Sequence, residues 1–134
     1  MSEENVETVR QSLEAFDRRD RTAWLATRDD QDYEVVADRY WPEADAVRGR
    51  EAAWEFYVKV AEAFEQLPAG DAELVDAGAD KVLAHQRSDV RGLTSGAGVE
   101  FNYWVVITFR EGRIVRDQWF ADRDEALEAA GLSE

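Results

Sequence analysis

Apolar residues recur every three or four positions near the start of the chain. They follow Ser2 and an acidic pair, and they form a stripe of four side chains: Val6, Val9, Leu13 and Phe16. Serine and acidic residues favour the first turn of a helix, and the spacing places the apolar side chains on one face. The pattern predicts an amphipathic helix. Asp20 then predicts the cap of a second, short helix that turns Trp24 and Leu25 inward.

Residues 49–67 carry an apolar surface that is wider than the stripe of the first helix. One face of this segment carries Trp54 and Tyr57, and a second face carries Phe56 and Val60. An apolar arc this wide predicts a helix that is covered on two sides. We expect a sheet on one side and the first helix, or a cavity, on the other.

The chain from residue 71 to residue 121 is typical of antiparallel strands joined by turns. The turns contain glycine and fall at residues 77–80, 92–98 and 110–113. A short β-prone run at residues 33–36 precedes them, and an acidic segment at residues 122–130 predicts a C-terminal helix. In the long strand that ends at Phe109, both alternating faces are largely apolar, so both need cover from helices, a C-terminal segment or another chain.

The charge of the chain narrows the classes of partner. The 134 residues suit one domain with one core, and 16 basic against 30 acidic residues give a formal charge of −14. This charge repels nucleic acid and anionic membranes. No stretch approaches the roughly 20 apolar residues of a membrane helix, and the first residues lack the features of a signal peptide. We expect a soluble, cytoplasmic protein that binds neither nucleic acid nor membrane.

Metal and thiol chemistry have little support in the composition. Cysteine is absent, and His85 is the only histidine. Thiolate metal sites, disulfides and cysteine nucleophiles are therefore excluded, and imidazole ligands are few. We expect neither a metal nor a cofactor.

Five motifs follow one another along the chain, at residues 4–10, 14–16, 47–52, 112–116 and 121–132. Their order and spacing resemble the SnoaL-like branch of the nuclear transport factor two-like superfamily. The resemblance implies a cone-shaped α+β fold, in which a curved antiparallel or mixed sheet wraps around N-terminal helices and a short C-terminal helix follows. It also implies a pocket at the open end of the cone and usually a homodimer formed through the sheet.

The resemblance implies several activities without choosing among them. Polyketide cyclases, ketosteroid isomerases, dehydratases and epoxide hydrolases of this fold use acid–base chemistry on small apolar molecules without a cofactor. Other members have no known activity, so a non-catalytic ligand-binding or dimeric structural domain is the alternative. Ketosteroid isomerases use a tyrosine and two carboxylic acids, but the matching positions here carry Ser12 or Phe16 and Trp104. Scytalone dehydratases use two histidines, and this chain has only His85.

Asp117 is the first candidate for catalysis. If Asn102 and Trp104 lie on the concave face of the sheet, as the family pattern suggests, the neighbouring strand points Asp117 and Trp119 the same way. Among aromatic side chains the carboxyl group would lose water, which favours its protonated form. Such a group suits a general acid or base near neutral pH.

His85 and Arg87 lie two residues apart in a β-prone run and therefore share a face. Together they could polarise or protonate a substrate oxygen. The alternatives are structural. A strand histidine is often only hydrogen-bonded, Arg87 could pair with Glu100, and Asp117 could pair with Arg87 or Arg116 or be solvated at a sheet edge.

Five aromatic residues could form a wall for a flat or cyclic ligand: Tyr40, Trp41, Trp54, Tyr57 and Trp119. The alternative is that most of them are core, since helical spacing alone buries Trp54 and Tyr57. Tyr57 is also a catalytic candidate, because a buried phenol needs a partner and can stabilise an enolate. The predicted catalytic residues are Asp117, His85 and Tyr57. A small apolar or aromatic ligand would contact the aromatic wall together with Trp104, Asn102 and Arg87.

Overall fold

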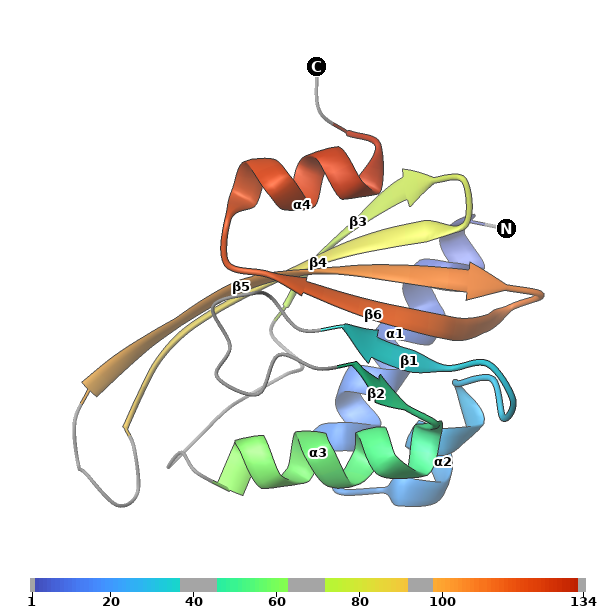
Figure 1. Ribbon diagram of the computed structural model, residues 1–134, viewed down its shortest axis with the longest axis horizontal. Coiled ribbons are helices and arrows are strands. Elements are labelled where there is room, and N and C mark those ends of the chain that lie inside the picture. Colours follow the sequence, from blue (N-terminus) through green and yellow to red (C-terminus); the bar gives the residue numbers. More distant parts are fainter. Residues whose placement is uncertain (1, 37–45, 63–71, 92–97, 133–134) are drawn as a thin grey trace.

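Figure 1 shows a computed structural model of the chain, which describes residues 2–36, 46–62, 72–91 and 98–132. The described residues form four helices and six strands. In chain order these are α1 (Ser2–Asp17), α2 (Arg21–Ala26), β1 (Glu34–Val36), β2 (Val47–Arg48), α3 (Arg50–Glu62), β3 (Glu73–Gly78), β4 (Lys81–Arg91), β5 (Gly98–Arg110), β6 (Arg113–Phe120) and α4 (Arg123–Ala130).

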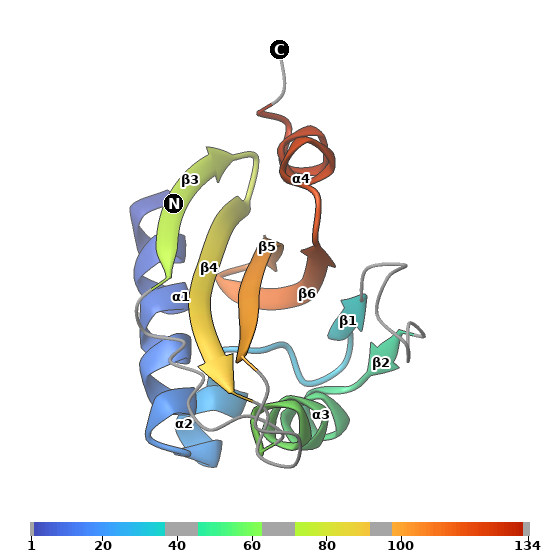
Figure 2. The ribbon, with the colours of Figure 1, turned by 90° about the vertical axis from the view of Figure 1, so that its left-hand side faces the viewer.

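The six strands form one curved sheet in the order β2-β1-β6-β5-β4-β3. Neighbouring strands are antiparallel except β1 and β6, which run parallel, so the sheet is mixed. Helices α1, α2 and α3 lie on one side of the sheet, which we call the inner face, and α4 lies against the other, the outer face (Figures 1 and 2). The predicted α+β cone with a curved antiparallel or mixed sheet is confirmed, and the sheet is mixed and not closed.

The helix ends follow the local chemistry of the sequence, and the predicted cap Asp20 is confirmed. The carboxylate of Asp20 accepts the backbone N–H of Ala23 and so caps α2. Asp122 caps α4 in the same way, and Gly131 ends that helix with a φ of 78°. The structure describes α3 as far as Glu62, and the remainder of the predicted segment lies outside the described residues.

Each face of the sheet buries its own apolar cluster. On the inner face, α1, α2 and α3 pack against apolar side chains of β4, β5 and β6. On the outer face, Ala126 and Ala130 of α4 pack against Leu83 and Val106. The apolar faces of β5 are therefore covered by N-terminal helices and by the C-terminal helix. None of the helices in the described ranges has the length and apolar content needed to cross a membrane.

The pairing of β5 with β6 contains a β-bulge. Next to the turn, Phe109 pairs with Ile114, but Thr108 pairs with Arg116, so Val115 is an extra residue in β6. An extra residue shifts the register by one and turns every later side chain to the other face. The bulge therefore decides which residues of β6 face inward.

One predicted arrangement is wrong because of this bulge. Beyond it, Trp119 pairs with Val105, and both line the inner face together with Asp117. Trp104 and Asn102 occupy the alternate positions of β5 and point to the outer face. The prediction that these two residues share a concave face with Asp117 assumed an unbroken register from the turn, and it fails by one residue.

Candidate functional site

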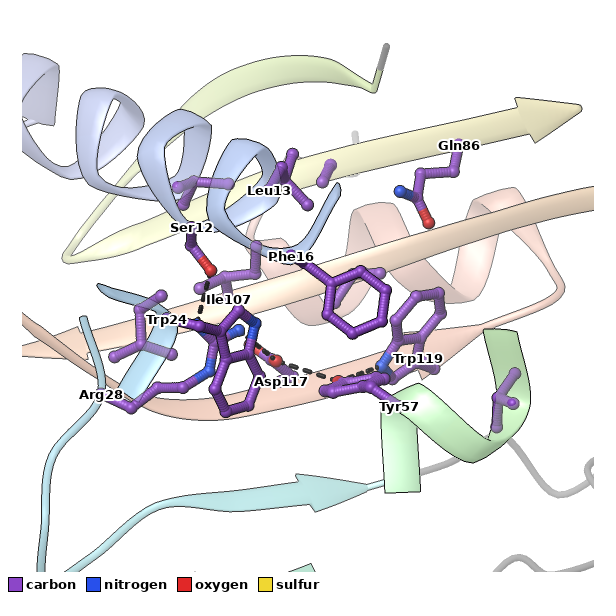
Figure 3. Close-up of a pocket in the computed structure, with 15 residues that line it drawn as sticks. Ser12, Leu13, Phe16, Trp24, Arg28, Tyr57, Gln86, Ile107, Asp117 and Trp119 are labelled. Carbon is purple, nitrogen blue, oxygen red and sulfur yellow. Dashed lines mark hydrogen bonds and ion pairs between the residues drawn. The ribbon is translucent and has the colours of Figure 1, made fainter. Parts of the chain in front are cut away.

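A cavity lies between α1, α2 and α3 and the inner face of β4, β5 and β6 (Figure 3). It measures about 80 Å³ and is open to solvent. Its wall is mostly apolar, with a few polar side chains among aromatic and aliphatic ones. The lining residues are Val9, Ser12, Leu13, Phe16, Trp24, Arg28, Tyr57, Val60, Ala84, Gln86, Val105, Ile107, Ile114, Asp117 and Trp119.

Asp117 is the carboxylate of this cavity, and only 3% of the residue is exposed. Its Oδ2 atom accepts hydrogen bonds from the hydroxyls of Tyr33, at 2.6 Å, and Tyr57, at 2.9 Å. The guanidinium of Arg28 donates to the same oxygen at 3.3 Å and forms an ion pair with it. The Oδ1 atom is buried and has no hydrogen-bond partner among the described residues. Oδ2 thus accepts three hydrogen bonds, whereas Oδ1 accepts none from the described residues.

Arg28 supplies the positive charge beside Asp117. Its guanidinium carbon lies 3.6 Å from the ring centre of Trp24, and one of its nitrogens donates to the hydroxyl of Ser12 in α1. Burial alone lowers the pKa of an arginine, but the neighbouring Tyr33 and Asp117 outweigh it, and the pKa of Arg28 is raised. Arg28 therefore stays charged and neutralises the buried carboxylate.

Tyr33 and Tyr57 remain protonated donors in this site. Burial raises the pKa of both hydroxyls, and the negative charge of Asp117 raises it further. The indole N–H of Trp119 donates to the hydroxyl of Tyr57 at 2.8 Å. A chain of hydrogen bonds therefore runs from Trp119 through Tyr57 to Asp117 (Figure 3).

Three of the predicted site residues, Asp117, Tyr57 and Trp119, meet at the cavity. Trp54 instead packs edge-on against Phe16 and Trp24 in the core, with 8% of it exposed, and is absent from the cavity lining. This packing fits the alternative prediction, in which Trp54 is a core residue. Tyr40 and Trp41 lie outside the described residues.

The other predicted site residues gather on the outer face, away from Asp117. The Nε2 atom of His85 lies 2.7 Å from Oδ1 of Asn102, and its ring stacks on Trp104 with 4.5 Å between ring centres. Arg87 forms an exposed ion pair with Glu100 at 3.3 Å. The sheet therefore separates this group from the cavity, and neither His85 nor Arg87 is the polar partner of the carboxylate.

Three residues of the site were not among the predicted site residues: Arg28, Tyr33 and Ser12, of which Ser12 was named only as a position that matches a ketosteroid isomerase site. Ser12 carried a signal, because it is a polar residue three positions after Val9 on the buried stripe of α1. Tyr33 carried a weaker one, since it opens a β-prone run. Arg28 had none, because it stands in a polar loop and its ion pair joins residues 89 positions apart.

The chain is similar to known proteins in both sequence and structure. A family model described as a SnoaL-like domain matches residues 9–117. A search of curated proteins finds no match. The structure of an NTF2-like protein from Burkholderia xenovorans matches with a TM-score of 0.78 at 26% identity, and the match covers 97% of each chain.

Two further structures share the fold at lower identity. TerC, crystallised with polyporic acid, matches with a TM-score of 0.71 at 20% identity, over 96% of this chain and 98% of TerC. A Bacillus subtilis protein provisionally assigned as an isomerase matches with a TM-score of 0.67 at 24% identity, over 98% of this chain and 95% of its own.

Proposed function

Because this chain belongs to the SnoaL-like domain family, we propose that its cavity binds a small, mostly apolar molecule and that Asp117 exchanges a proton with it without a cofactor. The observation that carries the proposal is a buried carboxylate whose Oδ1 atom has no partner among the described residues, in a cavity with apolar walls. Buried polar atoms are rarely left without a hydrogen bond. A bound molecule that presents an acidic C–H or O–H group to Oδ1 supplies the missing hydrogen-bond donor.

The residues around Asp117 have separate roles in a proton transfer. Arg28 compensates the charge of the carboxylate, and Tyr33 and Tyr57 hold Oδ2, so Oδ1 is the oxygen that accepts the proton. When the proton leaves a carbon next to a carbonyl group, the electron pair stays on the molecule as an enolate. If a C=C bond is conjugated with the enolate, return of the proton from Asp117 to the far carbon completes an isomerisation. If the enolate carbon attacks a second carbonyl group of the same molecule, a C–C bond closes the ring, and the resulting alkoxide takes the proton back from Asp117, which completes a cyclisation.

Two of the structural relatives support this class of function. TerC shares the fold and was crystallised with a small molecule, polyporic acid. The Bacillus subtilis protein carries a provisional assignment as an isomerase. Both are consistent with small-molecule chemistry in a cavity of this kind.

Proton exchange in deuterated water tests the proposal with few assumptions. Exchange of the α-hydrogens of cyclohexanone needs only removal and return of a proton, and proton NMR follows it directly. We expect the wild-type protein to accelerate exchange over buffer, and Asp117→Asn, checked for folding by circular dichroism, to remove the acceleration. Trp104→Phe on the outer face is the matched control and keeps the full rate. Acceleration that survives in Asp117→Asn overturns the role of Asp117.

A non-catalytic binding module is the second candidate, and the three donors on Oδ2 favour it. Through them Asp117 ties β6 to α3, to the residue before β1 and to the segment after α2, which is a structural task. In this case small cyclic ketones raise the melting temperature without any acceleration of exchange. Trp119→Ala then reduces the thermal shift, whereas Asp117→Asn leaves it unchanged.

A further inference from the structure

The charges in the cavity cancel. Arg28 and Asp117 are the charged residues of its lining, and their side chains are 6% and 5% exposed. Tyr33 and Tyr57 stay neutral, because burial and then the charge of Asp117 raise the pKa of both hydroxyls. A charged ligand in an apolar, buried site needs an unpaired opposite charge. Here both charges already have a partner, so a charged ligand gains no counter-charge.

Two buried atoms of the Arg28–Asp117 pair lack a hydrogen bond, one acceptor and one donor. The acceptor is Oδ1 of Asp117 and the donor is Nε of Arg28, and both are buried with no hydrogen-bond partner among the described residues. A hydroxyl group both donates and accepts, so it can serve either atom. A carboxylate can only accept, and it would place a second negative charge beside Asp117.

The dimensions of the cavity limit the size of the ligand. A cavity of about 150 Å³ holds a benzene ring, whereas this one measures about 80 Å³ and is open to solvent. A single ring therefore fits only with part of the ring in the cavity and the rest at its open end. Phe16, Trp24 and Trp119 line this space and suit a flat ring.

Building on the proposed function, we propose that the ligand is an uncharged molecule of about one ring whose hydroxyl group donates to Oδ1 of Asp117. Arg28 is the residue that sets this preference, because its charge cancels that of the carboxylate. Without Arg28 the site would hold an unpaired negative charge, and without Asp117 an unpaired positive one. The net charge of −14 on the whole chain further disfavours anions.

Para-nitrophenol is a suitable probe, since its hydroxyl titrates near neutral pH and only its ionised form has a strong visible absorption band. We expect this band to fall when wild-type protein is added at neutral pH. Affinity, measured by equilibrium dialysis, should fall about tenfold for each pH unit above the pKa of the probe. The groups that face Asp117 are Arg28, Tyr33 and Tyr57, and all three have raised pKa values, so none of the three loses its proton as the pH rises through the pKa of the probe.

Para-nitroanisole, in which a methyl ether replaces the hydroxyl, is the matched control ligand, and we expect it to bind at least tenfold more weakly. Trp104→Phe on the outer face is the control variant and should bind para-nitrophenol like the wild type. Asp117→Asn leaves the charge of Arg28 unpaired, and this variant should retain the visible band on binding, because it prefers the phenolate. If Asp117→Asn does not fold, the wild-type pH series still decides the question.

The outcomes separate this inference from the proposed function. Equal binding of para-nitrophenol and para-nitroanisole overturns the hydroxyl contact and leaves the binding cavity intact. A visible band that grows on binding to the wild type overturns the preference for uncharged ligands. If neither probe binds, while cyclohexanone exchange is accelerated and depends on Asp117, the inference about the ligand fails alone. If neither probe binds and no ketone binds or exchanges, the proposed function fails with it.

Discussion

Replacing Arg28 by methionine tests how the buried ion pair contributes to stability. The change keeps the unbranched stem of the side chain and removes the guanidinium, leaving the carboxylate of Asp117 buried at 3% exposure. Removal of one partner of a buried ion pair costs about 3–5 kcal/mol, because the other charge remains without compensation. Loss of the stacking on Trp24, at 3.6 Å, adds about 0.5–2 kcal/mol. The hydroxyls of Tyr33 and Tyr57 still donate to the carboxylate, which places the expected total near 3–5 kcal/mol.

Urea unfolding followed by far-ultraviolet circular dichroism measures this cost as a lower midpoint at an unchanged slope. Arg87→Met is the matched control, since its ion pair with Glu100 is exposed, and such pairs contribute about 0–1 kcal/mol. The double variant Arg28→Met with Asp117→Asn removes both charges and should be less destabilised than Arg28→Met alone. If Arg28→Met costs no more than Arg87→Met, the reasoning about the buried pair is refuted.

Three further predictions concern pH, helix ends and the two faces of the sheet. Tyr33 and Tyr57 keep their protons when folded at pH values where the unfolded chain loses them. Their contribution is therefore complete below about pH 10 and declines above it, by about 1.4 kcal/mol per pH unit for each tyrosine and about 2.8 kcal/mol for the two together. Urea unfolding at alkaline pH should show about half of this combined slope for Tyr33→Phe, and a slope equal to that of the wild type contradicts the argument. Gly131→Ala should lower the unfolding free energy by about 1 kcal/mol, because φ is 78° there, and no loss in urea unfolding would count against this. Trp119→Ala should weaken binding of ring compounds in dialysis whereas Trp104→Ala should not, and equal effects would mean that the cavity is not the binding site.

Local patterns in the sequence were enough to predict most of the elements. The apolar stripe of α1, the cap Asp20 and the glycine turns at residues 77–80 and 110–113 each depend on a few neighbouring residues, so they can be recognised directly in the sequence. The covered faces of β5 were also predictable, because an alternating strand that is apolar on both sides must be buried on both. The homodimer and the cytoplasmic location stay predictions.

The site was only partly predictable, since it depends on contacts between distant segments. Asp117 and Trp119 could be named because the family pattern indicates that this strand lines a pocket, and Tyr57 because helical spacing buries a phenol that needs a partner. Arg28 could not, since nothing in its local sequence indicates that it turns inward to the carboxylate. The predicted position of Trp104 on the concave face was wrong for a different reason. A bulge adds one residue to β6, and no local sequence pattern at Val115 indicates it.

That bulge makes the register of one hairpin a functional property of the chain. If Val115 paired with Thr108 in a regular ladder, the following half of β6 would be rotated, so that Asp117 would lie under α4 and Gln118 would enter the cavity. Deleting Val115 would instead keep every later pair, because Arg116 would follow Ile114 in regular alternation and Asp117 would still pair with Ile107. A slip of one residue in the register would thus exchange the chemistry of two surfaces without altering a single side chain of the site. When relatives are aligned across the turn at residues 110–113, an aspartate matches Asp117 in function only where the pairing of the two strands also places it on the inner face.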